Sequence, residues 1–373
     1  MNDMDKDQVQ SSLTEQDKDV SPEMKETIDI NAQNETKQES GAFAMPKKGQ
    51  TPKLNGASAL NQFVLMVVLA SAIGFISAFI PVLWLVAILF FPIPIAILVL
   101  RHNLLVGFIG LIFTFIILSL MVGMPSALST ILQSGFLGIF FGYCFARKSR
   151  PIYVLLGGTI IAAAGTAASI IISTVIAGLP ISSLMNEFYN TINLYFDTLS
   201  KSSSYQQILP NGTTLADYQD YFIAFIKKIL PGAFVISSMF MALLNYLISK
   251  KILANMGYSI PSLPAFSLWR LDWRFAWGVI IGLALWFIGQ KSDISLLDMI
   301  GTNIIYILVP VLLVCGLSFL VWLLKYWQAS NIFKIIIVII LINFFQYTLF
   351  LLIFMGLFDP LFDFRKKLSS KNQ

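Results

Sequence analysis

The polar side chains that lie inside the apolar parts of this sequence are neutral. Nine acidic residues follow position 46, and we place none of them within a long apolar run. The residues that do lie there carry amide and phenol groups, and we single out Gln133, Asn303, Tyr306, Asn343, Gln346 and Tyr347. The last three are spaced as one face of a helix. We expect these groups either to form hydrogen bonds between helices or to line a pocket for a largely uncharged ligand.

This residue set argues against catalysis. Ion-coupled transporters and proton relays place ionisable groups at membrane depth, and phosphoryl transfer needs clustered carboxylates to hold Mg²⁺. The single histidine, His102, argues against most histidine-based metal and protease sites. Cys144 and Cys315 lie far apart in apolar runs, which is typical of core residues. We therefore expect no enzyme activity, no catalytic residues, no cofactor and no metal site.

The composition is that of an integral membrane protein. Of the 373 residues, 57% are hydrophobic and only 12% are charged, whereas roughly a quarter are charged in a soluble domain. Runs of about 20 apolar residues can cross a bilayer, so the sequence predicts an all-α polytopic bundle of eight or nine spans. We place nine, at about 60–80, 82–100, 104–123, 127–146, 152–178, 231–249, 275–290, 301–324 and 332–357.

The charges and apolar runs divide the chain into five parts. Residues 1–46 carry a net charge of −7 and almost no aromatic side chains, so we interpret residues 1–58 as a disordered acidic cytoplasmic leader. The other parts are a five-span bundle (59–178), an external pair of amphipathic helices (179–230), further membrane helices (231–358) and a basic tail (359–373). We expect the external pair to lie on the membrane or to cap the bundle.

Basic residues indicate the orientation. If the N-terminus is inside, thirteen Lys and Arg residues of the connections lie on the cytoplasmic side and four lie on the other side, as the positive-inside rule requires. Nine spans place the tail outside, where its four basic residues break the rule. We predict a cytoplasmic N-terminus and leave the side of the tail open.

Small residues on the first span predict a close helix contact. Ala70, Gly74 and Ala78 are spaced by four and form one ridge. Such a ridge lets two backbones approach each other. It packs either within the protein or against a separate membrane subunit.

Two features predict contact with the membrane surface. Trp269, Trp273 and Trp277 follow one another at intervals of four, as an interfacial aromatic stripe would. In the tail we expect Asp359 to end the last helix and Asp363 to pair with a basic residue. We interpret the tail as an anchor on lipid headgroups, with docking of a partner as the alternative. The tail residues concerned are Asp359, Phe362, Asp363, Arg365, Lys366 and Lys367.

Three stretches carry a family resemblance: FPIPIAILVLRHNLLVGFIG from position 91, QSGFLGIFFGYCFARKSRP from position 133 and MGLFDPLFDFRKK from position 355. They resemble the YybS-like family of bacterial multi-pass membrane proteins of unknown function, over about residues 59–367. The first half of that family is similar to the substrate-binding S components of energy-coupling-factor transporters. S components are shorter, with about six helices, and lack the external pair.

The resemblance implies a bacterial inner-membrane protein that binds a small solute within its helices. Its partners would be the lipid bilayer, a small-molecule ligand and the ATPase and coupling subunits of a transporter, with no nucleic acid. An envelope scaffold or assembly protein without transport is the alternative function.

Overall fold

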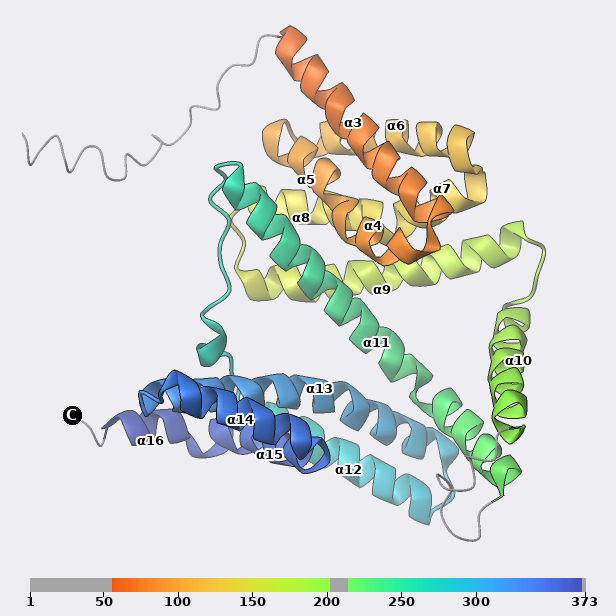
Figure 1. The fold of residues 1–373 in the computed structure, drawn as a ribbon. Helices are drawn as coiled ribbons and strands as arrows, with labels where there is room; N and C mark the ends of the chain where they lie inside the picture. The colour runs from red at the N-terminus through yellow and green to blue at the C-terminus, as the bar shows by residue number, and fades with distance from the viewer. Residues whose placement is uncertain (1–55, 202–213, 371–373) are drawn as a thin grey trace, which may run out of the picture. The chain divides into compact units, whose positions relative to one another are not determined.

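The computed structural model describes residues 56–201 and 214–370 (Figure 1). The predicted acidic leader lies outside this part of the chain, except for residues 56–58 at the start of the first described helix. The described residues contain helices and no strands, which confirms the predicted all-α membrane bundle.

The N-terminal helices follow the proline and glycine signals of the sequence. In chain order they are α3 (Gly56–Phe79), η1 (Pro81–Leu83), α4 (Trp84–Phe90), α5 (Pro92–Arg101), α6 (Leu104–Val122), α7 (Met124–Thr130), the π-helix η2 (Ile131–Gly135), α8 (Phe136–Ala146) and α9 (Pro151–Ile176). The second span is divided at Phe91, directly before Pro92. A proline fits the first turn of a helix because it has no N–H to leave unpaired.

Helix α5 forms the core of these helices, since every residue from Pro92 to Val99 is buried. Glycines on α8 allow this close packing. A Cβ added at Gly138 would lie 2.6 Å from the Pro92 carbonyl oxygen, and one added at Gly142 would lie 2.8 Å from that of Ala96. The glycine spacing of the fourth span therefore serves contacts within the protein.

The external pair is built differently from our prediction. Helix α10 (Ile181–Ser200) is separate, but the second amphipathic segment is the first part of α11 (Leu215–Asn255), a continuous helix of 41 residues. The expected boundary at residue 230 thus falls inside a helix. The two helices pack through the ring of Phe196 against Tyr218 and Phe222. At 1.5 Å per residue, α11 is about 60 Å long, twice the thickness of the hydrocarbon core.

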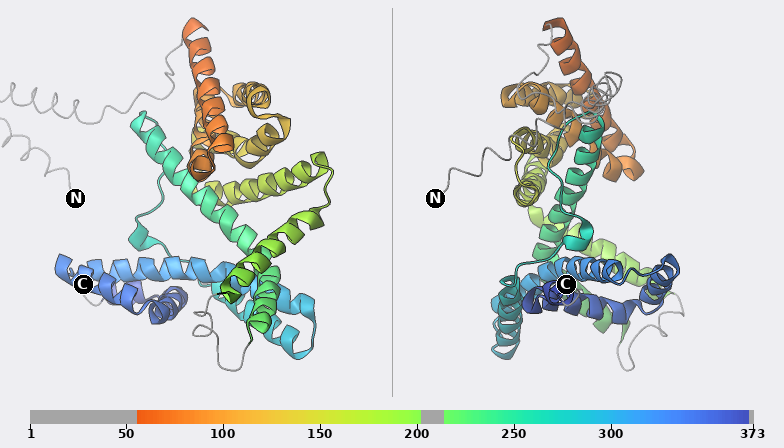
Figure 2. Two further views of the ribbon diagram at one scale, coloured as in Figure 1. Left: turned by 45° about the vertical axis from the view of Figure 1, so that its right-hand side comes forward. Right: turned by 90° about the vertical axis from the view of Figure 1, so that its left-hand side faces the viewer.

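The C-terminal helices are η4 (Phe266–Leu268), α12 (Phe275–Lys291), α13 (Ser295–Tyr326), α14 (Asn331–Asn343), α15 (Phe345–Phe362) and α16 (Phe364–Ser370). Figures 1 and 2 show α12, α13 and α15 side by side. The predicted single span 332–357 is instead two helices that meet at Phe344.

Helix α15 runs parallel to α13. A Cβ added at Gly356 would overlap the Leu312 carbonyl, the rings of Phe364 and Phe319 are 6.2 Å apart, and the Tyr326 hydroxyl donates to the Leu368 carbonyl at 2.9 Å. Helices α14 and α15 therefore leave one end of α13 and return to it. The tail therefore lies beside the end of α13 that carries Lys325.

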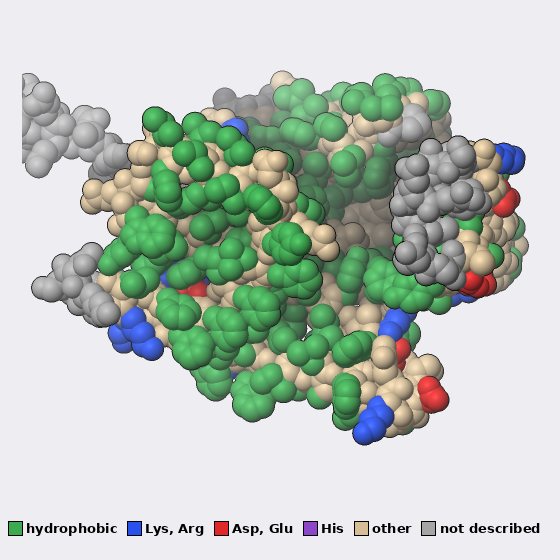
Figure 3. Space-filling view, turned by 60° about the horizontal axis from the view of Figure 1, so that its bottom comes forward, with side chains coloured by type: hydrophobic (Ala, Val, Ile, Leu, Met, Phe, Trp, Pro, Cys, Tyr) green, Lys and Arg blue, Asp and Glu red, His purple; other side chains and the backbone are tan. Residues whose placement is uncertain are grey.

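Eight described helical segments are long and apolar enough to cross a membrane, and α12 and α14 are shorter apolar helices of 17 and 13 residues. Figure 3 shows hydrophobic side chains over most of one face, with most of the visible charged side chains near its edges. A surface of this kind is typical of a protein solvated by lipid.

Candidate functional site

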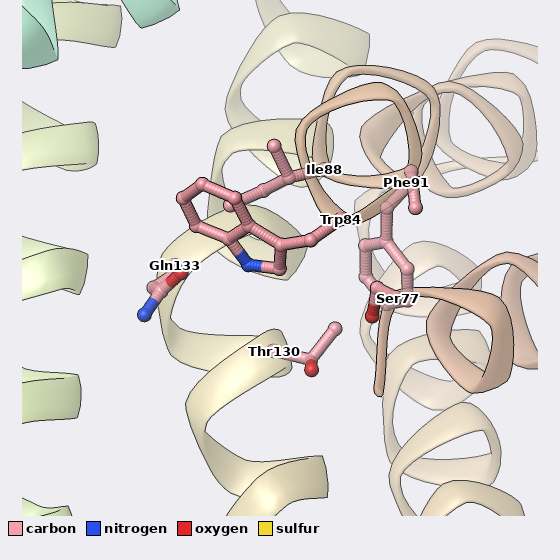
Figure 4. Close-up of a pocket in the computed structure, with 7 residues that line it drawn as sticks. Ser77, Trp84, Ile88, Phe91, Thr130 and Gln133 are labelled. Carbon is pink, nitrogen blue, oxygen red and sulfur yellow. The ribbon is translucent and has the colours of Figure 1, made fainter. Parts of the chain in front are cut away.

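A small cavity lies between the end of α3, helix α4 and the α7–η2 segment (Figure 4). Its volume is about 20 Å³, which is room for one water molecule. Figure 4 shows the indole ring of Trp84 among Gln133, Thr130 and Phe91. The lining combines apolar and polar side chains: Ser77, Trp84, Ala87, Ile88, Phe91, Thr130 and Gln133.

The π-helix η2 positions Gln133 on this cavity wall. Its extra residue per turn rotates the side chains that follow, and such bulges are frequent at functional sites. The Gln133 amide donates to Ser169 Oγ on α9 at 3.1 Å. Gly165 allows helix α9 to approach η2 closely, since a Cβ added at this position would overlap the Leu132 carbonyl. Beside it, Ser134 Oγ is buried and has no hydrogen-bond partner among the described residues.

The other five predicted pocket residues lie elsewhere. Asn303 is hydrogen-bonded to α11, and Tyr306 approaches the same helix at Gly232. The remaining three, Asn343, Gln346 and Tyr347, are exposed where α14 meets α15. Of the six residues, only Gln133 lines the cavity. The chain therefore does not gather them into one pocket.

Asn303 instead pairs with backbone groups beside a proline within α11. Pro231 lies inside α11 and cannot donate a backbone hydrogen bond. The Gly232 N–H donates to Asn303 Oδ1 at 2.6 Å, and Asn303 Nδ2 donates to the Lys228 carbonyl at 2.8 Å. One side-chain amide thus pairs both backbone groups next to the proline. The neighbouring Lys228–Asp298 ion pair, at 2.6 Å, ties the same two helices together.

A buried ion pair lies where α15 meets α16, and sequence reasoning missed it. Arg365 Nε donates to Asp359 Oδ2 at 2.7 Å, and the exposed fractions of the two side chains are 9% and 2%. The guanidinium also donates to the carbonyl oxygens of Ser267 at 2.5 Å and Trp269 at 3.1 Å. It faces the ring of Phe319, 5.6 Å from the centroid. The pair therefore fastens the tail to the segment that precedes α12.

A second layer of polar contacts surrounds this pair. Ser318 Oγ lies 2.7 Å from the Phe266 carbonyl oxygen, and Lys325 Nζ lies 3.2 Å from Ser267 Oγ. Arg270 pairs with Asp363 at 2.7 Å, which confirms the predicted partner type for Asp363. The signal in the sequence was an aspartate at the end of an apolar run, six residues before an arginine.

These contacts correct several expectations for the tail. Asp359 does not end its helix, because α15 continues through Pro360 to Phe362. It therefore lies within a membrane-span candidate, contrary to our placement of every acidic residue outside the spans. Arg365 is buried in protein rather than free to bind headgroups. Of the other predicted anchor residues, Phe362, Lys366 and Lys367 are exposed.

The tryptophan stripe and the small-residue ridge also differ from expectation. Only Trp277 belongs to α12, whereas Trp269 and Trp273 precede it in irregular structure. The three therefore do not form a stripe on one helix, although Trp273 and Trp277 are more than half exposed.

On α3, Ala70 is completely buried, and a Cβ at Gly74 would lie 2.7 Å from the Leu118 side chain. Ala78 is exposed. Two of the three ridge residues thus pack inside the protein, which leaves no continuous ridge for a separate subunit.

Comparison with known proteins gives a family and no function. No curated protein and no solved structure matches the chain. The model of one family, described as predicted membrane protein (DUF2232), matches residues 68–360, most of the described helices. The chain therefore belongs to the DUF2232 family of predicted membrane proteins.

Proposed function

We propose that this protein is a non-enzymatic membrane subunit that binds a small, largely uncharged solute at the cavity beside η2. The observation that carries the proposal is the meeting of Gln133, Thr130, Ser77 and the Trp84 indole around one cavity. An apolar site with a few polar groups that fix orientation is the usual form of a small-molecule pocket.

The position of Trp84 supports a site that opens to admit its solute. Trp84 is 49% exposed and stands on the short helix α4, directly after the 3-10 helix η1. A molecule larger than water requires this ring to move. The resemblance to S components of energy-coupling-factor transporters agrees with such a role, in which the ATPase and coupling subunits of a transporter would supply the energy.

Replacing Gln133 with leucine tests the site. We expect native mass spectrometry of the detergent-purified protein to show a co-purifying small molecule, and Gln133→Leu to reduce its occupancy about tenfold through loss of the amide hydrogen bond. Gln290→Leu is the matched control, because it makes the same change at an exposed position on α12, away from the cavity. Equal occupancy in Gln133→Leu, or a wild-type protein that carries no small molecule, counts against the proposal.

The tail returns to the end of α13 that carries Lys325, so we propose that the N-terminus and the tail are both cytoplasmic. This placement brings the basic tail into agreement with the positive-inside rule. We expect reporter fusions at residues 50 and 373 to report the cytoplasm and a fusion at residue 205 to report the other side. A reporter at 373 on the same side as one at 205 contradicts the returning α14–α15 pair.

One observation favours a scaffold or assembly role as the second candidate. The N-terminal part of α11 and helix α10 present exposed aromatic side chains, with Tyr195 65% and Tyr221 70% exposed. Exposed aromatic side chains are enriched at protein interfaces. Co-purification discriminates between the two functions: an ATPase and a membrane coupling subunit indicate transport, and envelope-synthesis or division proteins indicate a scaffold.

A further inference from the structure

The bend between α14 and α15 is exposed on the surface of the C-terminal helices. Every residue from Ile342 to Tyr347 is exposed, and α14 has no buried residue. Figures 1 and 2 show the bend beside the middle part of α13, a helix whose own middle is apolar. We take α13 as a membrane span, which puts the bend within the hydrocarbon layer.

This exposed bend carries polar groups that the described chain leaves unpaired. Asn343 Nδ2 donates to the Ile339 carbonyl of its own helix at 2.9 Å. Among residues 56–201 and 214–370, no hydrogen bond engages Asn343 Oδ1 or either end of the Gln346 amide. Lipid tails offer no partner, and an unpaired polar group in hydrocarbon is costly. Something other than lipid must therefore cover these amides.

We propose that the occupant is a second copy of this chain, joined to the first through the α14–α15 bend around a two-fold axis. A side-chain amide has both a donor and an acceptor, so the same amide on a symmetry-related copy can satisfy both at once. In an isologous contact the same patch meets itself, at the same membrane depth. An unrelated protein would need a complementary polar group at that depth, whereas a second copy supplies one by construction.

The surroundings of the amides suit a helix contact. Phe345 is 63% exposed and Tyr347 is 75% exposed, so each copy offers large aromatic surfaces beside its amides. Asn and Gln side chains are known to hold membrane helices together by hydrogen bonds. The aromatic rings would then shield those hydrogen bonds from lipid.

Cysteine crosslinking in native membranes tests the contact. Phe345→Cys places a thiol at the bend, and the native Cys144 and Cys315 are buried and do not compete. Ile280→Cys is the matched control, since Ile280 is an exposed apolar residue on α12. We expect oxidation to give a disulfide-linked dimer from Phe345→Cys and little or none from Ile280→Cys.

The amides are tested in the same background. We expect Asn343→Leu with Gln346→Leu to reduce crosslinking and to weaken self-association in bilayers by about tenfold or more. Swapping the amides, as Asn343→Gln with Gln346→Asn, should keep much of it. Because these residues are exposed, the leucine variant should still fold, and its unfolding midpoint checks this. Equal crosslinking at Ile280→Cys, unchanged association in the leucine variant, or a wild-type protein that stays monomeric or crosslinks to a different protein overturns the proposal.

Discussion

We expect Arg365→Met to lower the free energy of unfolding by about 3–5 kcal/mol, because it leaves the carboxylate of Asp359 buried without its partner. Chemical unfolding in detergent, followed by tryptophan fluorescence, measures the loss. The same change should raise the trypsin sensitivity of the tail, since Arg365 is what holds it to the carbonyl oxygens of Ser267 and Trp269. Lys251→Met is the control, an exposed basic residue near the end of α11, and should change stability little.

The double variant Asp359→Leu with Arg365→Met distinguishes a broken ion pair from lost packing. Replacing both members of a buried pair with apolar side chains is often close to neutral. We therefore expect the double variant to be more stable than Arg365→Met alone. If both proteins lose the same free energy, the guanidinium acts through its carbonyl contacts and not through the carboxylate.

The sequence predicts best the features that depend on local chemistry. The helix boundary at Pro92 follows from the residue itself, because a proline removes a backbone donor wherever it stands. The break at Phe344 has no proline or glycine near it in the sequence, so it could not be predicted in this way. After this break, α15 packs against α13 through the close approach of Gly356 to the Leu312 backbone. A contact between segments far apart in the chain produces no periodic pattern in the sequence.

Candidate sites were harder to predict for the same reason. Residue type identified Gln133 and Asn303 as polar groups within helices. It could not show that Gln133 lines a cavity, or that Asn303 pairs with the backbone beside Pro231. An arginine in a short aromatic and basic tail, as Arg365 is, is typical of an anchor on lipid headgroups. Its burial depends on carbonyl groups of a segment almost 100 residues earlier in the chain.

Asn303→Leu should lower the free energy of unfolding by about 2–4 kcal/mol. The leucine leaves the Gly232 N–H and the Lys228 carbonyl without their partner, and each unpaired buried group costs about 1–3 kcal/mol. Thr302→Val is a matched control on the preceding residue, because the Thr302 hydroxyl is buried and has no partner among the described residues. We expect that variant to be neutral or slightly stabilised.

A double-mutant cycle with Pro231→Ala tests the proposed cause directly. Alanine restores the backbone donor and lets α11 straighten, so the Gly232 N–H can return to the Lys228 carbonyl four residues before it. Asn303→Leu should then cost clearly less in the Pro231→Ala background than in the wild-type protein, and the difference is the coupling energy of the two sites. An equal cost in both backgrounds would show that Asn303 stabilises the α11–α13 contact independently of the proline break.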